Sequence, residues 1–500
     1  MKKILFIISI LFFLNSVNAN NYNNQLNEGI ELSYNFKLNE AARVYDQLIK
    51  ASPDNPLAYY HKSSLFFWKL MSVPDNADFD QFLKYSDLAI DKINVMMKKN
   101  DPDNDLLLLA GNTYTLRTIA FARKENYLEC IWAAQKANSF LEKLKNSDPD
   151  VYDAYLGLGL FKIFLSQVPS SFKWALEVIG FKADLKLGLE YLTLAAEKAE
   201  KNEVESKFYY AFILSELLHD YRKSEKVLAR LSAKYPGNLL FSYFLAVNSI
   251  KLRDLDVAEK QLQKIQRVKN NPLPKLLAFT HFLMGDVHFY SGNYSKAIRF
   301  YTDFLAISKE NDYKGIAALR LGYSYDLSGN RRKAEEIYAL TGSGSRSIDE
   351  DRYAERKGKQ LTSRIVYYDE ALLLYGESLV MRGKTDSAES VFNKVINEGT
   401  EPEMIAEAEY QLALLYLSSN ELRKVKELAE SILSKKNLSE VWLYPYSLYL
   451  LSEIAVRERD QESFAEYKNR VENYSNFDFP SRLEGLFFSL EYRLNNSVEI

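Results

Sequence analysis

Glycine, proline and cysteine are all scarce in this chain of 500 residues, with 19, 12 and 1 copies respectively. So few turn-forming residues argue against a sandwich or barrel of many short strands. The single cysteine, Cys130, excludes an intrachain disulfide. We expect Cys130 to lie on the apolar side of a helix over residues 126–144, as a small core residue rather than a reactive thiol.

Long apolar runs are also missing, except at the start of the chain. Lys2 and Lys3 precede an apolar stretch over residues 4–14, and a small-residue cleavage pattern ends at Ala19. This arrangement is typical of a secretory signal peptide over residues 1–19. The stretch is too short to span roughly 30 Å of hydrocarbon. We therefore expect cleavage after Ala19 and a soluble exported protein, periplasmic or secreted.

Neither sign of charge is in large excess. The formal net charge of −3 becomes −5 when the two positive charges of Lys2 and Lys3 are removed with the signal. No long basic run offers a nucleic-acid surface, and export makes a nucleic-acid partner still less expected. No cysteine stands near the cleavage site, which argues against a lipid-anchored bacterial lipoprotein.

What the chain does contain is a repeated pair of helices. Gly285 and Gly322 are 37 residues apart, and so are Ala297 and Ala334. The other positions that fit this frame are Gly29, Ala41, Tyr45 and Pro53; Ala211, Leu214, Ser224, Leu228, Leu231 and Pro236; Ala246, Ala258, Leu262 and Ile265; Gly376, Ala388 and Phe392; and Leu412, Ala413, Tyr416, Val425 and Ala429. A period near 34 is typical of tetratricopeptide repeats. We predict an all-α solenoid of about ten antiparallel helix pairs.

The residue types in this frame have physical reasons. Glycine and alanine allow two helices to approach closely where they cross. Large aromatic side chains, such as Tyr301, Tyr325, Tyr338 and Phe392, are expected to fill the space between successive pairs.

The periodicity divides the mature chain into five parts. They are N-terminal repeats with lengthened helices over 20–153, a central segment over 154–270, repeats over 271–341, an insertion over 342–364 and C-terminal repeats over 365–500. The insertion begins Gly-Ser-Gly-Ser and continues with charged residues, so we expect an exposed, flexible connector. It is not a phosphate-binding loop, because no Gly-Lys-Ser/Thr follows its glycines.

One segment, over residues 154–192, differs from the other repeats. Its distinctive residues are Gly157, Gly159 and Phe161, then Ser166 and Pro169, then Glu177, Gly180 and Phe181, and finally Gly188. This series resembles the signature of the tetratricopeptide repeat protein 39 family, which includes the fungal inclusion body clearance protein. The resemblance is strongest over residues 105–270. It implies a helical-repeat protein without catalytic residues that acts through protein contacts, although the eukaryotic members are intracellular and lack an export signal.

The same segment has two physical interpretations. In the first it is an irregular helix pair, in which Pro169 ends one helix and Gly180 caps the next. In the second, the dense apolar side chains over residues 157–181 form a hairpin that touches a ligand or a membrane. This is the one place where the sequence would allow membrane contact.

Residues that could carry chemistry do not form a known motif. His281 and His288 are seven positions apart, whereas zinc on a helix needs a spacing of three or four and a third ligand. The acidic run from Asp101 begins like a calcium loop, but Leu106 stands where that loop needs glycine. No nucleophile sits in a recognisable elbow. We expect no metal, no cofactor and no enzymatic activity.

The remaining candidate is a surface. In a tetratricopeptide solenoid the first helix of each pair lines the concave face. The residues in these positions are Phe279, Phe282, Asp286, Phe289, Tyr290, Leu319, Tyr323, Asp326, Glu370, Leu373 and Glu377. This groove is aromatic and acidic, and we expect it to bind an apolar or basic polypeptide segment. Reversing the charges of Asp286, Asp326 and Glu377 should abolish capture; alternatively, several of the aromatic rings only pack against neighbouring repeats.

The sequence therefore favours an exported, non-catalytic scaffold that binds another protein. The alternative is an envelope glycan-binding protein built on the same repeats, against which stand only four tryptophans for sugar stacking and no lipid-anchor cysteine. A third possibility is an enzyme with a cryptic site, which a deep pocket with clustered titratable groups would indicate. The identity of the partner and the oligomeric state are left open.

Overall fold

The computed structural model describes residues 21–72, 75–167, 181, 183–269 and 271–496. These residues form helices joined by turns, with no strand among them, and the predicted all-α fold is confirmed. The predicted signal peptide over 1–19 lies outside the described residues. The chain divides into two compact units. Unit 1 comprises Met1–Ala211, Lys226–Ser242 and Asn270–Leu273, and unit 2 comprises Phe212–Glu225, Tyr243–Lys269 and Pro274–Ile500.

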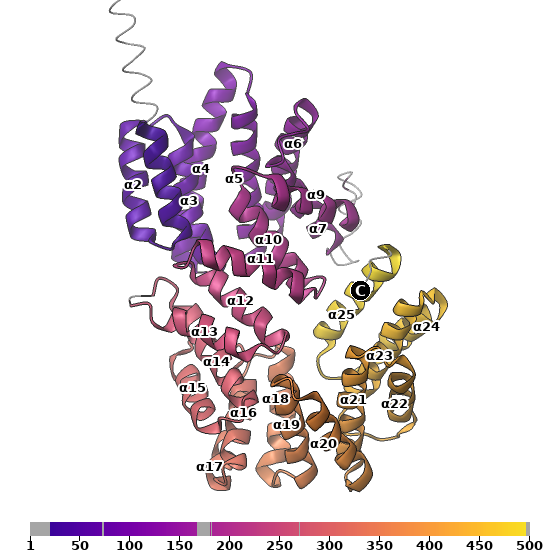
Figure 1. The fold of residues 1–500 in the computed structure, drawn as a ribbon. Coiled ribbons are helices and arrows are strands. Elements are labelled where there is room, and N and C mark those ends of the chain that lie inside the picture. Colours follow the sequence, from indigo (N-terminus) through magenta and orange to yellow (C-terminus); the bar gives the residue numbers. More distant parts are fainter. Residues whose placement is uncertain (1–20, 73–74, 168–180, 182, 270, 497–500) are drawn as a thin grey trace, which may run out of the picture. The chain divides into compact units, whose positions relative to one another are not determined.

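Unit 1 is built from helices that pack on their neighbours in the chain (Figure 1). They are a helix over residues 21–34, α2 (Leu38–Ala51), α3 (Pro56–Leu70), α4 (Asn76–Lys99), α5 (Asn104–Arg123), α6 (Tyr127–Ser147), α7 (Ala154–Ser166) and α9 (Leu185–Lys198). The next three, α10 (Glu203–Glu216), α11 (Tyr221–Lys234) and α12 (Leu239–Lys251), contribute residues to both units. Side-chain caps begin several of these helices; for example, Asp75 accepts a hydrogen bond from the backbone N–H of Ala77 at 2.9 Å.

A buried tryptophan organises the centre of unit 1. Trp68 is almost fully buried, and its ring lies 5.5 Å from Phe208, 6.1 Å from Phe241 and 6.4 Å from Tyr34. The Tyr34 hydroxyl is 2.7 Å from both carboxylate oxygens of Glu205. Burial raises the pKa of Glu205 to about 7. This cluster joins the start of unit 1 to its last helices.

Unit 2 is also built from helix pairs. Its helices are α13 (Leu255–Gln266), α14 (Pro274–Tyr290), α15 (Tyr294–Ile307), α16 (Lys314–Leu327), α17 (Arg331–Tyr338), the 3-10 turn η2 (Thr341–Ser343), α18 (Asp349–Ser363), α19 (Tyr368–Met381), α20 (Thr385–Glu398), α21 (Pro402–Ser418), α22 (Leu422–Ser434), α23 (Leu443–Glu458), α24 (Gln461–Glu472) and α25 (Pro480–Asn496). The first helices of the pairs also contact one another, as α14 does α16, α19 does α21 and α21 does α23. They therefore share one face of the array.

Four helix pairs close in the same way. A glycine of the first helix lies against an aromatic ring sixteen positions later on the second, in the pairs Gly29 and Tyr45, Gly285 and Tyr301, Gly322 and Tyr338, and Gly376 and Phe392. A Cβ added to any of these glycines would come closer than 3.0 Å to the ring. The sequence prediction placed these aromatic side chains between successive pairs, whereas the structure places each ring against the glycine of its own pair.

The expectation for residues 342–364 needs correction. This segment is neither flexible nor exposed throughout, because α18 packs against α16 and α17 and buries Ala354 and Leu361 completely. Asp351 fixes the start of the helix by accepting hydrogen bonds from the backbone N–H groups of Ile316 and Ser345, each at 2.9 Å. The sequence is strongly charged, but its buried charges have partners within unit 2.

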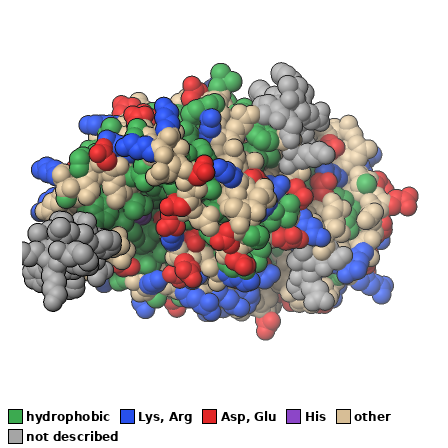
Figure 2. Space-filling model, turned by 90° about the horizontal axis from the view of Figure 1, so that it is seen from above, with side chains coloured by type: hydrophobic (Ala, Val, Ile, Leu, Met, Phe, Trp, Pro, Cys, Tyr) green, Lys and Arg blue, Asp and Glu red, His purple; other side chains and the backbone are tan. Residues whose placement is uncertain are grey.

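The surface carries both signs of charge. On the face shown in Figure 2, Lys and Arg side chains are interspersed with Asp and Glu. Within the described ranges, no helix combines the length and the apolar character that crossing a bilayer requires.

Candidate functional site

A cavity of about 450 Å³ lies within unit 2. Its described lining residues come from the first helices of the pairs, α14, α16, α19, α21 and α23, together with α18, α25 and the residues just before α23 and α25. The second helices α15, α17, α20, α22 and α24 contribute none of them. The cavity therefore lies on the face that the first helices share.

Aromatic rings make up much of the cavity wall. They are Phe289, Tyr290, Tyr323, Tyr353, Tyr410, Trp442, Tyr446, Tyr449 and Phe479. Trp442 meets Tyr410 edge-on with ring centroids 5.0 Å apart, and Tyr446 meets Trp442 edge-on at 5.7 Å. Such edge-to-face contacts hold each ring in one orientation and give the wall a defined shape.

A buried ion-pair network supports one side of the cavity. The Lys357 ammonium lies 2.9 Å from Glu440 and 3.3 Å from Glu370, and both carboxylates are almost fully buried. Arg356 binds Glu440 at 2.6 Å, and Arg364 binds Glu370 at 2.8 Å. Burial opposes ionisation of both carboxyls, but Lys357 and the arginines outweigh it and hold the pKa of Glu370 and of Glu440 below the usual value. These ion pairs stabilise the fold of unit 2.

Two other carboxyl groups on the cavity wall, those of Glu377 and Glu407, have no cation bonded to them among the described residues. Glu377 accepts a hydrogen bond from the Gln411 amide at 3.1 Å, and neither Glu377 nor Glu407 forms an ion pair with any residue that the structure describes. Burial raises the pKa of Glu377 to about 7 and that of Glu407 to about 8. The surrounding carboxylates Glu440, Glu377 and Glu370 add to the rise for Glu407, while Lys357 opposes it.

The cations of the wall, by contrast, are all paired. Arg320 binds Asp286 at 2.6 Å, Lys357 binds Glu440 at 2.9 Å, and Arg482 binds Glu350. Among the described lining residues, the titratable groups without an ion-pair partner are therefore two carboxyl groups, and they lie among aromatic rings.

The structure brings seven of the eleven predicted groove residues to this cavity. They are Phe289, Tyr290, Leu319, Tyr323, Glu370, Leu373 and Glu377. The other four lie elsewhere. Phe279 and Phe282 pack against the ring of Tyr313 at 5.9 and 5.5 Å, so they belong to the core of the repeats.

The two predicted aspartates are structural. Asp286 is buried, binds Arg320 and accepts a hydrogen bond from the Tyr301 hydroxyl at 2.6 Å. Asp326 binds Arg331 and accepts from the hydroxyl of Tyr338, both at 3.0 Å, away from the cavity. Reversing these charges would break buried pairs and destabilise the fold. Of the three residues chosen for charge reversal, only Glu377 lines the cavity.

Sequence reasoning missed several lining residues. Glu407, Tyr410 and Gln411 lie on α21, the first helix of a pair whose repeat was recognised, so applying the same rule to that helix would have found them. The lining residues of α18 and α25 carry no repeat signal. Their place in the wall depends on contacts between segments far apart in the chain.

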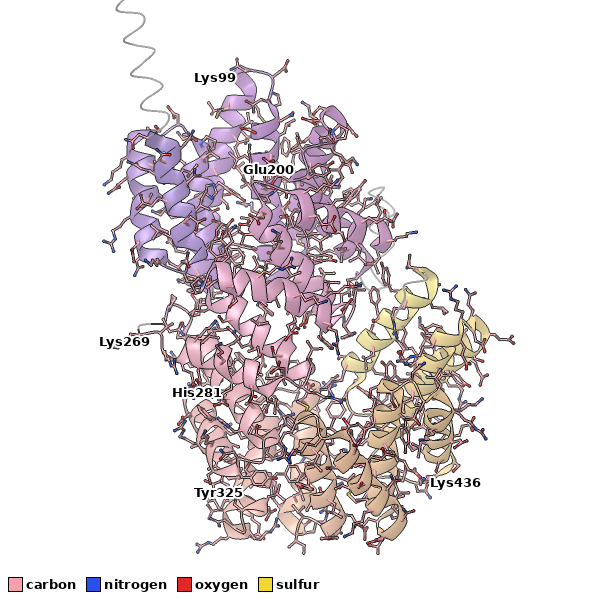
Figure 3. All side chains as sticks on the ribbon, viewed as in Figure 1. Lys99, Glu200, Lys269, His281, Tyr325 and Lys436 are labelled. Atoms are coloured by element: carbon pink, nitrogen blue, oxygen red, sulfur yellow. The ribbon has the colours of Figure 1, made fainter. Side chains whose placement is uncertain are left out.

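In the part of the chain that the structure describes, no three His, Cys, Asp or Glu side chains are placed so that they could hold a metal ion. His281 lies on α14 (Figure 3), and its Nδ1 is 3.5 Å from Asp303. Burial lowers the pKa of His281. This single contact is not a ligand set.

The chain has recognisable relatives. A family model described as Iml2/Tetratricopeptide repeat protein 39 matches residues 113–364, and a tetratricopeptide repeat model matches residues 370–398. No curated protein matches the sequence.

Solved structures of several repeat proteins are also similar. The P58(IPK) TPR domain is 12% identical, with 96% of this chain and 100% of that chain covered and a TM-score of 0.22. Yeast Tom70 is 12% identical, with coverages of 90% and 92% and a TM-score of 0.31. A Rap protein complexed with competence and sporulation factor is 13% identical, with coverages of 93% and 99% and a TM-score of 0.33.

Proposed function

Because the chain belongs to the Iml2/tetratricopeptide repeat protein 39 family, we propose that it is a non-catalytic scaffold that binds a polypeptide partner. The family match over 113–364 confirms the resemblance noted in the sequence, and the repeat at 370–398 extends the helical array. Helix-pair arrays of this kind present a continuous face of first helices to a ligand.

The partner binds in the cavity of unit 2 as a segment that carries a Lys or Arg between apolar side chains. The observation behind this assignment is the pair Glu377 and Glu407, two partly buried carboxyl groups without an ion-pair partner among the described residues. A cationic side chain would form charge-assisted hydrogen bonds with them. The rings of Tyr410 and Trp442 would supply apolar contact and cation–π attraction.

An array of short peptides that combine Lys, Leu and Phe tests this assignment. We expect binding that the double substitution Glu377→Gln/Glu407→Gln weakens at least about tenfold, or about 1.4 kcal/mol. Glu398→Gln, at an exposed position on α20, is the matched control and should leave the affinity unchanged. A peptide with norleucine in place of Lys should bind the wild type no more tightly than it binds the double variant. Equal affinities of the wild type and the double variant for the lysine peptides would refute the assignment.

Export is the second element of the proposal. Its support is the pattern of Lys2, Lys3 and the apolar stretch over 4–14. N-terminal sequencing of the protein from a native envelope fraction should find Asn20 as the first residue. A protein that retains Met1 and remains in the cytoplasm would refute export.

A glycan is the second candidate ligand. The corresponding activity would be enzymatic turnover of that glycan. Trp442 and Tyr410 offer rings for sugar stacking, and carboxyl groups with pKa values of about 7 and 8 suit general acid–base chemistry. Thermal stabilisation by oligosaccharides, lost in the Glu377→Gln/Glu407→Gln variant, would favour this candidate over a peptide.

A further inference from the structure

Unit 1 contains a second cavity, of about 430 Å³, between α5, α6 and α7. Its volume lies in the range of small-molecule sites, roughly 300–1,000 Å³. Most of its described lining is hydrocarbon, including Ile119, Ile131, Ala134, Leu160 and Leu165. This apolar lining distinguishes the cavity from the cavity of unit 2, whose wall carries many charged groups.

The polar side chains of this cavity do not offer hydrogen bonds to a ligand deep inside it. The hydroxyl of Thr115 donates to the backbone carbonyl of Gly111 and that of Thr118 to the carbonyl of Tyr114, both at 2.9 Å. The single proton of each hydroxyl is therefore already used within α5. The backbone groups along the helices are already bonded within them. Tyr127, another of the polar lining residues, lies at the exposed start of α6.

The cavity opens to solvent beside two aromatic side chains. These lining residues, Tyr127 and Phe164, are 65% and 37% exposed. Exposed apolar side chains that line an apolar cavity are typical of a binding site.

We propose that this cavity binds one linear hydrocarbon chain, such as the acyl chain of a fatty acid, with its polar end at the rim near Tyr127. A polypeptide does not suit the interior, because its backbone N–H and C=O groups would lose water and find no partners there. A hydrocarbon chain needs none. Burial of its methylene groups is favourable at roughly 0.8 kcal/mol for each CH₂.

Titration of the mature full-length protein with a fluorescent fatty acid, cis-parinarate, and displacement by palmitate test the proposal. We expect one site per chain. Ala134→Phe, which places a ring in the cavity, should weaken binding at least about tenfold. Ser139→Phe adds the same ring at an exposed position of α6 outside the cavity and should change nothing. The Glu377→Gln/Glu407→Gln variant should bind palmitate normally, which separates this site from the proposed peptide site.

Cys130 provides an independent readout, because it lines the cavity and is the only cysteine in the chain. Palmitate should slow its alkylation by N-ethylmaleimide in the wild type, and much less in Ala134→Phe. The proposal fails if palmitate neither binds nor protects Cys130, or if apolar peptides displace the probe and palmitate does not.

Discussion

At the scale of single residues, acidic side chains on the wall of the unit 2 cavity fall into two classes. Glu370 and Glu440 are held ionised by Lys357 and by neighbouring arginines. Glu377 and Glu407 have no such cation bonded to them among the described residues, and burial raises the pKa of each. This difference separates residues that maintain the fold from residues that can receive a ligand.

The raised pKa values predict how stability depends on pH. Glu377 and Glu407 keep their protons in the folded protein up to pH about 7 and 8, but lose them near 4.5 when unfolded. The folded state therefore binds more protons over this range, and the free energy of unfolding should fall as the pH rises, by about 1 kcal/mol per pH unit for Glu407 between pH 6.5 and 8. The lowered pKa of His61, about 4, acts in the opposite direction, but only below 6.5.

Urea unfolding across this pH range measures the effect, and Glu407→Gln should flatten the profile. A profile with the same slope in the variant would show that Glu407 is ionised in the folded protein. Binding of a lysine peptide should strengthen over the same range, because the peptide must displace protons from both carboxyl groups at the lower pH.

At the scale of elements, the glycine and the ring that faces it define a helix pair. Gly322→Ala would push a methyl group into the Tyr338 ring and should cost about 1–3 kcal/mol of unfolding free energy. Gly342→Ala is the matched control, because the nearest atom to its added Cβ, on Glu355, is 3.9 Å away. Chemical unfolding of both variants measures the difference. Equal stabilities would mean that the pair can relax around a methyl group.

The inserted helix α18 is held by its charges as well as by its apolar side. Lys357→Met removes the cation between Glu440 and Glu370 and leaves two buried carboxyl groups short of a partner, which should cost about 3–5 kcal/mol. Lys359→Met is the control, because Lys359 is 73% exposed and pairs only with Glu355. That surface pair should contribute less than about 1 kcal/mol. Thermal unfolding of the two variants distinguishes these outcomes.

At the scale of the whole molecule, local spacing predicted the helix pairs. Long-range contacts determine the position of α18 and the pairing of the buried charges. Gly285, Gly322 and Gly376 revealed the first helices because close helix approach needs a small residue at a regular interval. The same logic could not place α18, whose Lys357 bonds to Glu440, 83 positions later. The spacing also could not distinguish Asp286, which pairs with Arg320, from Glu377, which has no ion-pair partner among the described residues. An acidic residue has the same place in the sequence pattern whether or not the fold brings a cation to it.

The central claim is that the unit 2 cavity holds a basic, apolar segment of another protein. Photo-crosslinking from a reactive amino acid at Leu414, a lining residue, tests it in living cells, with Lys436, outside the cavity, as the control position. The account predicts a crosslink to a Lys- or Arg-containing segment of one protein, lost in the Glu377→Gln/Glu407→Gln background and absent from position 436. A crosslink that survives both carboxyl substitutions, or none at position 414, would contradict it.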